Sequence, residues 1–155
     1  MTPRLQFALL RLWHAWLAGG FLVAWLSADE DTYAMHQFSG YAVLVALVVR
    51  VLAAAFAPKT SPWRLPRPRL KWSAKGRHPL LAWFAASLLV SVGFCALLGA
   101  LADGLTWLEH PHEALANLAL WVIGGHVAFV VTLFGGKRVW ARLQHYLSPV
   151  KEMFS

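Results

Sequence analysis

Residues 79–102, PLLAWFAASLLVSVGFCALLGALA, form an apolar run without a single charged side chain. Such a run can cross a hydrocarbon layer roughly 30 Å thick and is too long for a buried helix of a small soluble domain. Because backbone inside lipid must satisfy its own hydrogen bonds, the run predicts a transmembrane helix. Similar runs occupy residues of about 5–27, 35–57 and 112–134. The sequence therefore predicts an all-α integral membrane protein, a four-transmembrane-helix bundle that forms a single membrane domain over residues 1–155.

The composition of the 155-residue chain supports this class. Hydrophobic residues make up 59% and charged residues 14% of the chain, whereas soluble proteins average roughly 45–50% and 25%. This balance excludes a soluble enzyme, a disordered chain and a disulfide scaffold. The single cysteine, Cys95, lies inside an apolar run, so we expect it to pack as a small apolar residue and not to carry thiol chemistry.

The basic residues gather in two segments, which predicts the orientation of the helices. The connection 58–78 contains Lys59, Arg64, Arg67, Arg69, Lys71, Lys75 and Arg77 and no acid, and the tail 135–155 adds further bases. The charged residues of the other two connections are all acidic, among them Asp103 and Glu109, and neither connection has a Lys or Arg. Because basic connections stay in the cytoplasm, both termini are predicted inside and the acidic connections outside. The net charge of +7 is then explained by basic segments that determine topology and contact the lipid bilayer. We therefore expect no nucleic-acid partner.

Four histidines lie in or at the ends of the apolar runs, where an ionisable residue is costly and indicates function. His126 follows His112 by 14 residues, which is nearly four helical turns, so both rings leave one face roughly 21 Å apart. His14 lies in the inner half of the first run, at the predicted depth of His126. His36 opens the second run at the depth of His112. The sequence therefore predicts an inner pair, His14 with His126, and an outer pair, His36 with His112.

Two imidazoles at each depth favour axial ligation of haem iron in a helix bundle. A zinc or nickel site would gather three or more ligands, and a proton relay would need carboxylates within the spans. We therefore expect two haem b groups. Gly40 lies one turn after His36 and is a candidate for close approach of a helix backbone to a flat cofactor. The alternative role of this glycine is helix–helix packing. The same two alternatives stay open for Gly20.

The remaining polar residues leave alternatives open. Arg50 follows His36 by 14 residues, so it shares the face of that histidine and either pairs with an inner haem propionate or extends to the cytoplasmic surface. His110 is an alternative to His112 but breaks the 14-residue spacing. His78, His110 and His145 are expected to be solvated residues near the membrane interface.

Four motifs, in order along residues of about 4–137, resemble the bacterial cytochrome b561 family, which includes the cytochrome b subunits of nickel-iron hydrogenases. The motifs are Arg11-Leu-Trp-His14-Ala-Trp16, His36-Gln-Phe-Ser-Gly40-Tyr41, Lys75-Gly-Arg-His78-Pro79-Leu80, and His112-Glu113-Ala-Leu-Ala-Asn117 followed by His126-Val127-Ala128. The third motif departs from the family pattern, because it lacks an asparagine and has Leu81 where the family has glycine.

The resemblance implies a dihaem cytochrome of the bacterial inner membrane, with haem ligands at His14, His36, His112 and His126. It implies electron transfer between the quinone pool and a redox partner, as a quinol/quinone oxidoreductase or, in some relatives, by oxidation of superoxide. The outer connections lack Lys and Arg, which argues against an outer route for superoxide and favours a basic periplasmic c-type cytochrome or another redox subunit. A homodimer is compatible with so small a bundle. The alternatives are a cofactor-free membrane anchor or assembly subunit and a small metal-ion permease.

Overall fold

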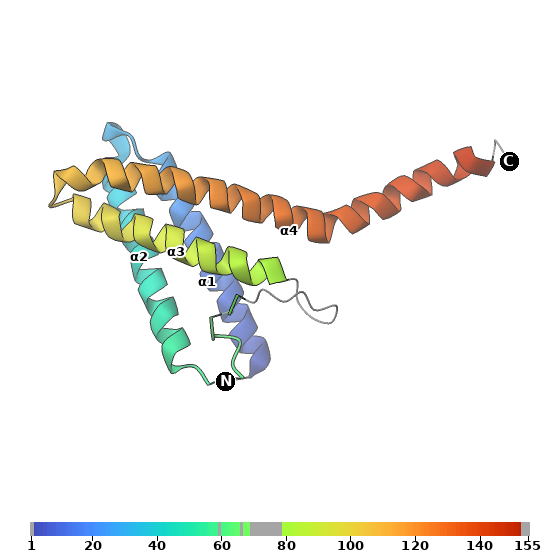
Figure 1. Ribbon diagram of the computed structural model, residues 1–155, viewed down its shortest axis with the longest axis horizontal. Helices are drawn as coiled ribbons and strands as arrows, with labels where there is room; N and C mark the ends of the chain where they lie inside the picture. Colours follow the sequence, from blue (N-terminus) through green and yellow to red (C-terminus); the bar gives the residue numbers. More distant parts are fainter. Residues whose placement is uncertain (1, 59, 66, 69–78, 153–155) are drawn as a thin grey trace. The chain divides into compact units, whose positions relative to one another are not determined.

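The computed structural model describes residues 2–58, 60–65, 67–68 and 79–152. No strand occurs in these ranges, and the predicted all-helical class is confirmed. In chain order, the elements are α1 (Pro3–Leu26), the short 3-10 helix η1 (Glu30–Thr32), α2 (Tyr33–Phe56), α3 (Pro79–Ala102), a second 3-10 helix η2 (Thr106–Leu108) and α4 (Glu109–Glu152) (Figure 1).

Four helical segments are long and apolar enough to cross a membrane. They are Arg4–Leu26, Glu30–Phe56, Leu80–Ala102 and Thr106–Leu133. The ends of these segments agree with the ends of the four predicted apolar runs to within two helical turns. The length and hydropathy that a bilayer requires of a helix define both sets of bounds.

The fourth helix is longer than the apolar run that predicted it. The run ends near residue 134, whereas the helical backbone of α4 continues to Glu152. The continuation contains Lys137, Arg138 and Arg142, which are unsuited to hydrocarbon, but arginine, lysine, leucine and alanine are good helix formers. Apolarity therefore marks where a helix can lie in lipid and does not mark where the helix ends.

The chain forms two compact units, Met1–Ala119 and Leu120–Ser155. The first unit contains α1, α2, α3 and the first turns of α4, and the second contains the rest of α4. The candidate site described below lies entirely in the first unit.

Helix α2 is the central helix of the first unit and packs against both α1 and α3. Its buried residues recur every three or four positions and so form one face; they are Ser39, Val43, Leu47, Arg50 and Ala54. On the side of α1, a Cβ atom added to Gly20 would lie 3.0 Å from Cγ2 of Val43. Gly20 therefore allows close packing of α1 on α2. Of the two roles predicted for this glycine, the structure shows helix–helix packing.

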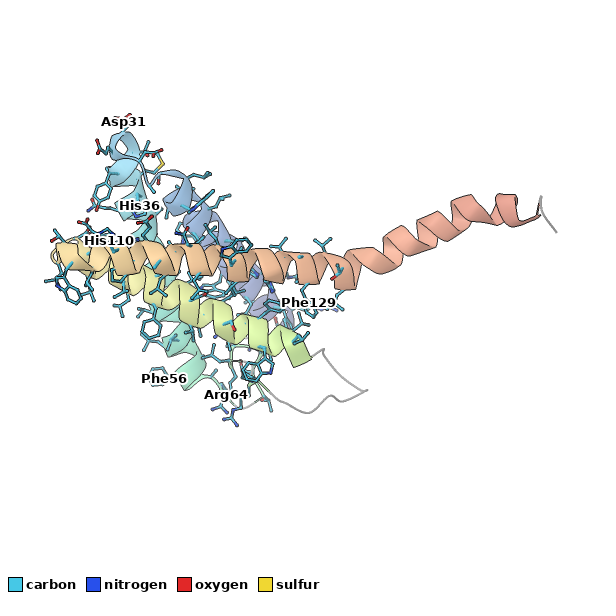
Figure 2. All side chains as sticks on the ribbon, turned by 45° about the horizontal axis from the view of Figure 1, so that its top comes forward. Asp31, His36, Phe56, Arg64, His110 and Phe129 are labelled. Atoms are coloured by element: carbon cyan, nitrogen blue, oxygen red, sulfur yellow. The ribbon has the colours of Figure 1, made fainter. Side chains whose placement is uncertain are left out.

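The two ends of this unit carry different side chains (Figure 2). His36 lies near the end that holds η1, whereas Phe56 and Arg64 lie at the opposite end. We refer to these as the η1 end and the Phe56 end.

Candidate functional site

His36 and His112 lie side by side at the η1 end. His36 comes from the first turn of α2 and His112 from the first turn of α4. The centroids of the two imidazole rings are 6.0 Å apart, and the ring planes are inclined by 75°. The structure thus brings together the two histidines that the sequence paired by depth.

Each of these histidines donates a hydrogen bond from Nδ1 to a backbone carbonyl. His36 donates to the carbonyl of Ala24 over 2.7 Å, in the last turn of α1, where helix carbonyls lack intrahelical partners. His112 donates to the carbonyl of Cys95 over 3.0 Å. A carbonyl only accepts, so Nδ1 carries the proton and Nε2 keeps its lone pair in both rings. Metal-binding histidines use this arrangement, in which the second nitrogen is fixed by a carbonyl or carboxylate.

The two rings border a cavity of about 660 Å³. This volume lies within the range of small-molecule and cofactor sites, roughly 300–1,000 Å³. The wall is mostly apolar and comes from α1, α2, α3 and the first turns of α4. Gly40 is part of this wall, and a Cβ atom added there would meet no atom within 4 Å. Gly40 therefore faces open space in the cavity, in contrast to Gly20, which packs against another helix.

Asp103 lies at the rim of the cavity and binds one face of α2. Its Oδ1 atom accepts hydrogen bonds from Gln37 Nε2 over 2.9 Å and from the Tyr33 hydroxyl over 3.4 Å, and Oδ2 accepts one from the Tyr41 hydroxyl. The three donors are four residues apart in sequence and so share a helix face. Hydrogen bonds from Tyr41 and Gln37 lower the pKa of the Asp103 carboxyl below its usual value. The ring of Tyr33 in turn stacks on His36, with centroids 5.9 Å apart.

The lining of the cavity is acidic. It includes Asp103, Glu109 and Glu113, and none of its described residues is Lys or Arg. An anion would therefore find no cationic partner in this part of the wall. The arrangement suits a ligand whose body is neutral and whose anionic groups, if it has any, are solvated.

Arg50 lies toward the Phe56 end and is bound to protein groups. Its guanidinium lies 5.6 Å from the ring centroid of Trp13 and 5.8 Å from that of Trp63, and Nη1 donates to the Trp63 carbonyl over 2.5 Å. Because Arg50 is only 6% exposed, its side chain does not extend into water, as the alternative of reaching the cytoplasmic surface requires. The structure shows a cation held between two indoles and a carbonyl.

The inner pair is divided between the two units. His14 lies on α1 in the first unit with an exposed side chain, and His126 lies on α4 in the second unit. Their pairing stays a prediction. His110 is exposed on the first turn of α4, and His145 lies on the continuation of α4. His78 lies outside the described residues.

The sequence interpretation missed the residues that support the histidines. They are Tyr33, Gln37, Cys95, Gly99 and Asp103. The spacing of Tyr33, Gln37 and Tyr41 was visible in the sequence, but nothing in a single sequence states that Asp103 faces them. Within the described part of the chain, no three His, Cys, Asp or Glu side chains form a group able to hold a metal ion.

No protein-family model matches the chain, and no curated protein or solved structure matches it either. The functional argument therefore depends on the geometry of the site.

Proposed function

We propose that this chain is a membrane dihaem b-type cytochrome of the cytochrome b561 type. The observation that carries the proposal is the His36–His112 pair, whose two Nε2 atoms keep their lone pairs beside a cavity of cofactor size. The two imidazole rings lie close together, with centroids 6.0 Å apart.

In this proposal His36 and His112 would hold the iron of one haem through their Nε2 atoms. The carbonyls of Ala24 and Cys95 hold the rings in the ligating tautomer and increase the basicity of the ligating nitrogens. Gly40 leaves room for a flat ligand against α2. Haem held in this way supplies reversible one-electron chemistry, at a potential that depends on the axial ligands, nearby charge and burial.

The charge of the cavity wall adds a constraint on this site. Asp103, Glu109 and Glu113 offer no partner for the haem carboxylates, so those carboxylates are expected to be solvated. Negative charge near iron favours its more oxidised state, so the acidic wall is expected to lower the reduction potential of this haem.

The second haem is proposed to be bound by His14 and His126, with support only from the matched depths of the two histidines in the sequence. Haems at two depths would carry electrons across the bilayer, between the quinone pool and a redox partner. The acidic residues of the η1 end, such as Asp31 and Asp103, suit a basic periplasmic c-type cytochrome or another redox subunit through complementary charge. The same residues disfavour access of superoxide, an anion, at this end.

The membrane location is part of the proposal. Four helices have the length and composition of membrane spans, and large apolar side chains are exposed on α2, including Phe38 at 76% and Phe56 at 86%. Exposed apolar surface of this kind is unfavourable in water and favourable in lipid. With the basic 58–78 connection in the cytoplasm, both termini lie on the cytoplasmic side of a bacterial inner membrane, and the η1 end lies on the periplasmic side.

A reduced-minus-oxidised absorption spectrum and a haem assay of the purified protein test this function. We expect sharp b-type bands and two haems per chain, with one haem lost from either His36→Ala or His112→Ala. His110→Ala is the matched control, because His110 is an exposed histidine two residues before His112. Colourless protein would contradict the proposal and favour a cofactor-free anchor or assembly subunit.

A further inference from the structure

Helix α3 carries none of the proposed haem ligands, yet residues at its end contact His112 and the neighbours of His36 at the η1 end. Cys95 and Gly99 are four residues apart and lie one above the other on α3, and Asp103 directly follows Ala102, the last residue of the helix. We call these three residues the 95/99/103 face. Each of its three members makes a different contact.

Gly99 makes room for His112. A Cβ atom added to Gly99 would lie 2.8 Å from Cε1, 3.2 Å from Nδ1 and 3.4 Å from Nε2 of His112. The first of these distances is shorter than real contacts allow, and all three atoms belong to one rigid ring. Any side chain at position 99 therefore has to displace the imidazole.

Cys95 fixes the orientation of the same ring. Its carbonyl accepts the Nδ1–H of His112 over 3.0 Å, and its buried Sγ atom lies 3.8 Å from that nitrogen. Because Gly99 lies one turn later on the same face, its missing side chain leaves the carbonyl of Cys95 accessible to the ring. The close approach and the hydrogen bond thus depend on each other.

Asp103 acts on His36 through α2. It binds Gln37, the residue next to His36, and Tyr33, whose ring stacks on the His36 imidazole at an interplanar angle of 15°. The carboxylate therefore fixes the face of α2 beside the ligand and a ring that contacts the ligand directly.

We infer that the 95/99/103 face positions the His36–His112 pair, with Gly99 and Asp103 as positioning residues that act through the two histidines. The inference rests on the proposed function for the identity of the ligand that the pair receives. Its structural part, the dependence of the His112 ring on Gly99, can be measured without any cofactor.

Gly99→Ala tests the inference, with Gly93→Ala as the matched control. Both glycines lie on α3, but a Cβ atom at Gly93 would meet no atom within 4 Å. Cys95 is the only cysteine of the chain, so the rate of its reaction with a maleimide reports on the packing around His112. We expect Gly99→Ala to raise this rate severalfold and to lower retention of the haem at the His36–His112 pair, and we expect Gly93→Ala to change neither.

The outcomes separate the inference from the proposed function. Equal maleimide rates in the two variants would overturn the inference. A raised rate in Gly99→Ala alone, in protein that holds no haem in any form, would support positioning of His112 and contradict the proposed function.

Asp103 provides a second variant in case Gly99→Ala does not accumulate. Asp103→Ala removes all three hydrogen bonds to α2, whereas Asp103→Glu keeps a carboxylate. We expect Asp103→Ala to shift the ferric low-spin spectrum of this haem, which reports the orientation of the axial rings, and Asp103→Glu to restore part of the shift. An unchanged spectrum in Asp103→Ala would overturn the role of Asp103.

Discussion

The two ends of the α1–α2 pair each hold polar groups on the same face of α2, but they hold them differently. At the η1 end, His36 uses one ring nitrogen for a protein carbonyl and its other nitrogen keeps a lone pair beside a cavity. Toward the Phe56 end, Arg50 lies between Trp13 and Trp63 and donates to a carbonyl of the connection that follows α2. A polar residue in an apolar helix therefore indicates a ligand site only when one of its donor or acceptor atoms is left for a ligand beside a cavity. By this criterion the η1 end is a candidate binding site, and the environment of Arg50 is a structural contact.

The largest expected effect comes from separating the two histidine pairs. His36→Ala or His112→Ala should remove one haem, and His14→Ala or His126→Ala should remove the other. The spectra of the two classes of variant should therefore be complementary. Haem stoichiometry and low-temperature difference spectra of purified protein measure this. Loss of both haems from every one of the four variants would leave the pairing without support.

Gly40 sharpens the comparison, because its open space belongs to the cavity and to no neighbouring helix. Gly40→Ala should leave the thermal stability of the haem-free chain unchanged or slightly raised, since alanine favours a helix by up to about 1 kcal/mol over glycine. The same substitution should weaken haem retention at the His36–His112 pair. Gly19→Ala is the control, since a Cβ atom at Gly19 also meets no atom within 4 Å but Gly19 does not line the cavity. Equal haem retention in the two variants would show that the ligand does not occupy the space at Gly40.

Arg50→Ala tests the other end. The variant loses a charge-assisted hydrogen bond and two contacts with indole rings, so we expect the free energy of unfolding to fall by roughly 1–3 kcal/mol. Haem content and the potential of the haem at the His36–His112 pair should stay unchanged. Thermal unfolding followed by tryptophan fluorescence, together with a redox titration, measures both quantities. A shifted haem potential with unchanged stability would instead support a contact between Arg50 and a haem propionate.

The smallest effect concerns the pH dependence contributed by Asp103. Because its pKa is lowered in the folded chain, the ionised form favours folding. That contribution is complete above the ordinary aspartate pKa of about 4 and is lost as the pH falls below it. Asp103→Asn cannot titrate, so the stability advantage of the wild type over this variant should shrink on acidification. An advantage that grew toward acid pH would contradict the role of the carboxylate.

The sequence contained enough information for the helices and for one pairing of histidines. Long uncharged runs predict the spans because lipid imposes the same length on every helix that crosses it, and helical rise placed His36 and His112 at one depth. The supports of the pair could not be predicted. The contact between Asp103 and Tyr33 joins residues 70 positions apart, and the role of Gly99 depends on the position of a ring from another helix. The contacts of Arg50 involve Trp63. Trp63 belongs to the connection after α2, and hydrophobic periodicity does not predict where the residues of a connection lie.

The oxidised purified protein can test the central claim most directly by electron paramagnetic resonance. Two imidazoles on one iron predict a low-spin ferric signal, and ring planes inclined by 75° predict that it is strongly anisotropic. We expect this strongly anisotropic component in the wild type and in His110→Ala, and its loss in both His36→Ala and His112→Ala, which keep the signal of the second haem. A wild-type spectrum without this component, or spectra that keep it in both of those variants, would contradict haem ligation by this pair.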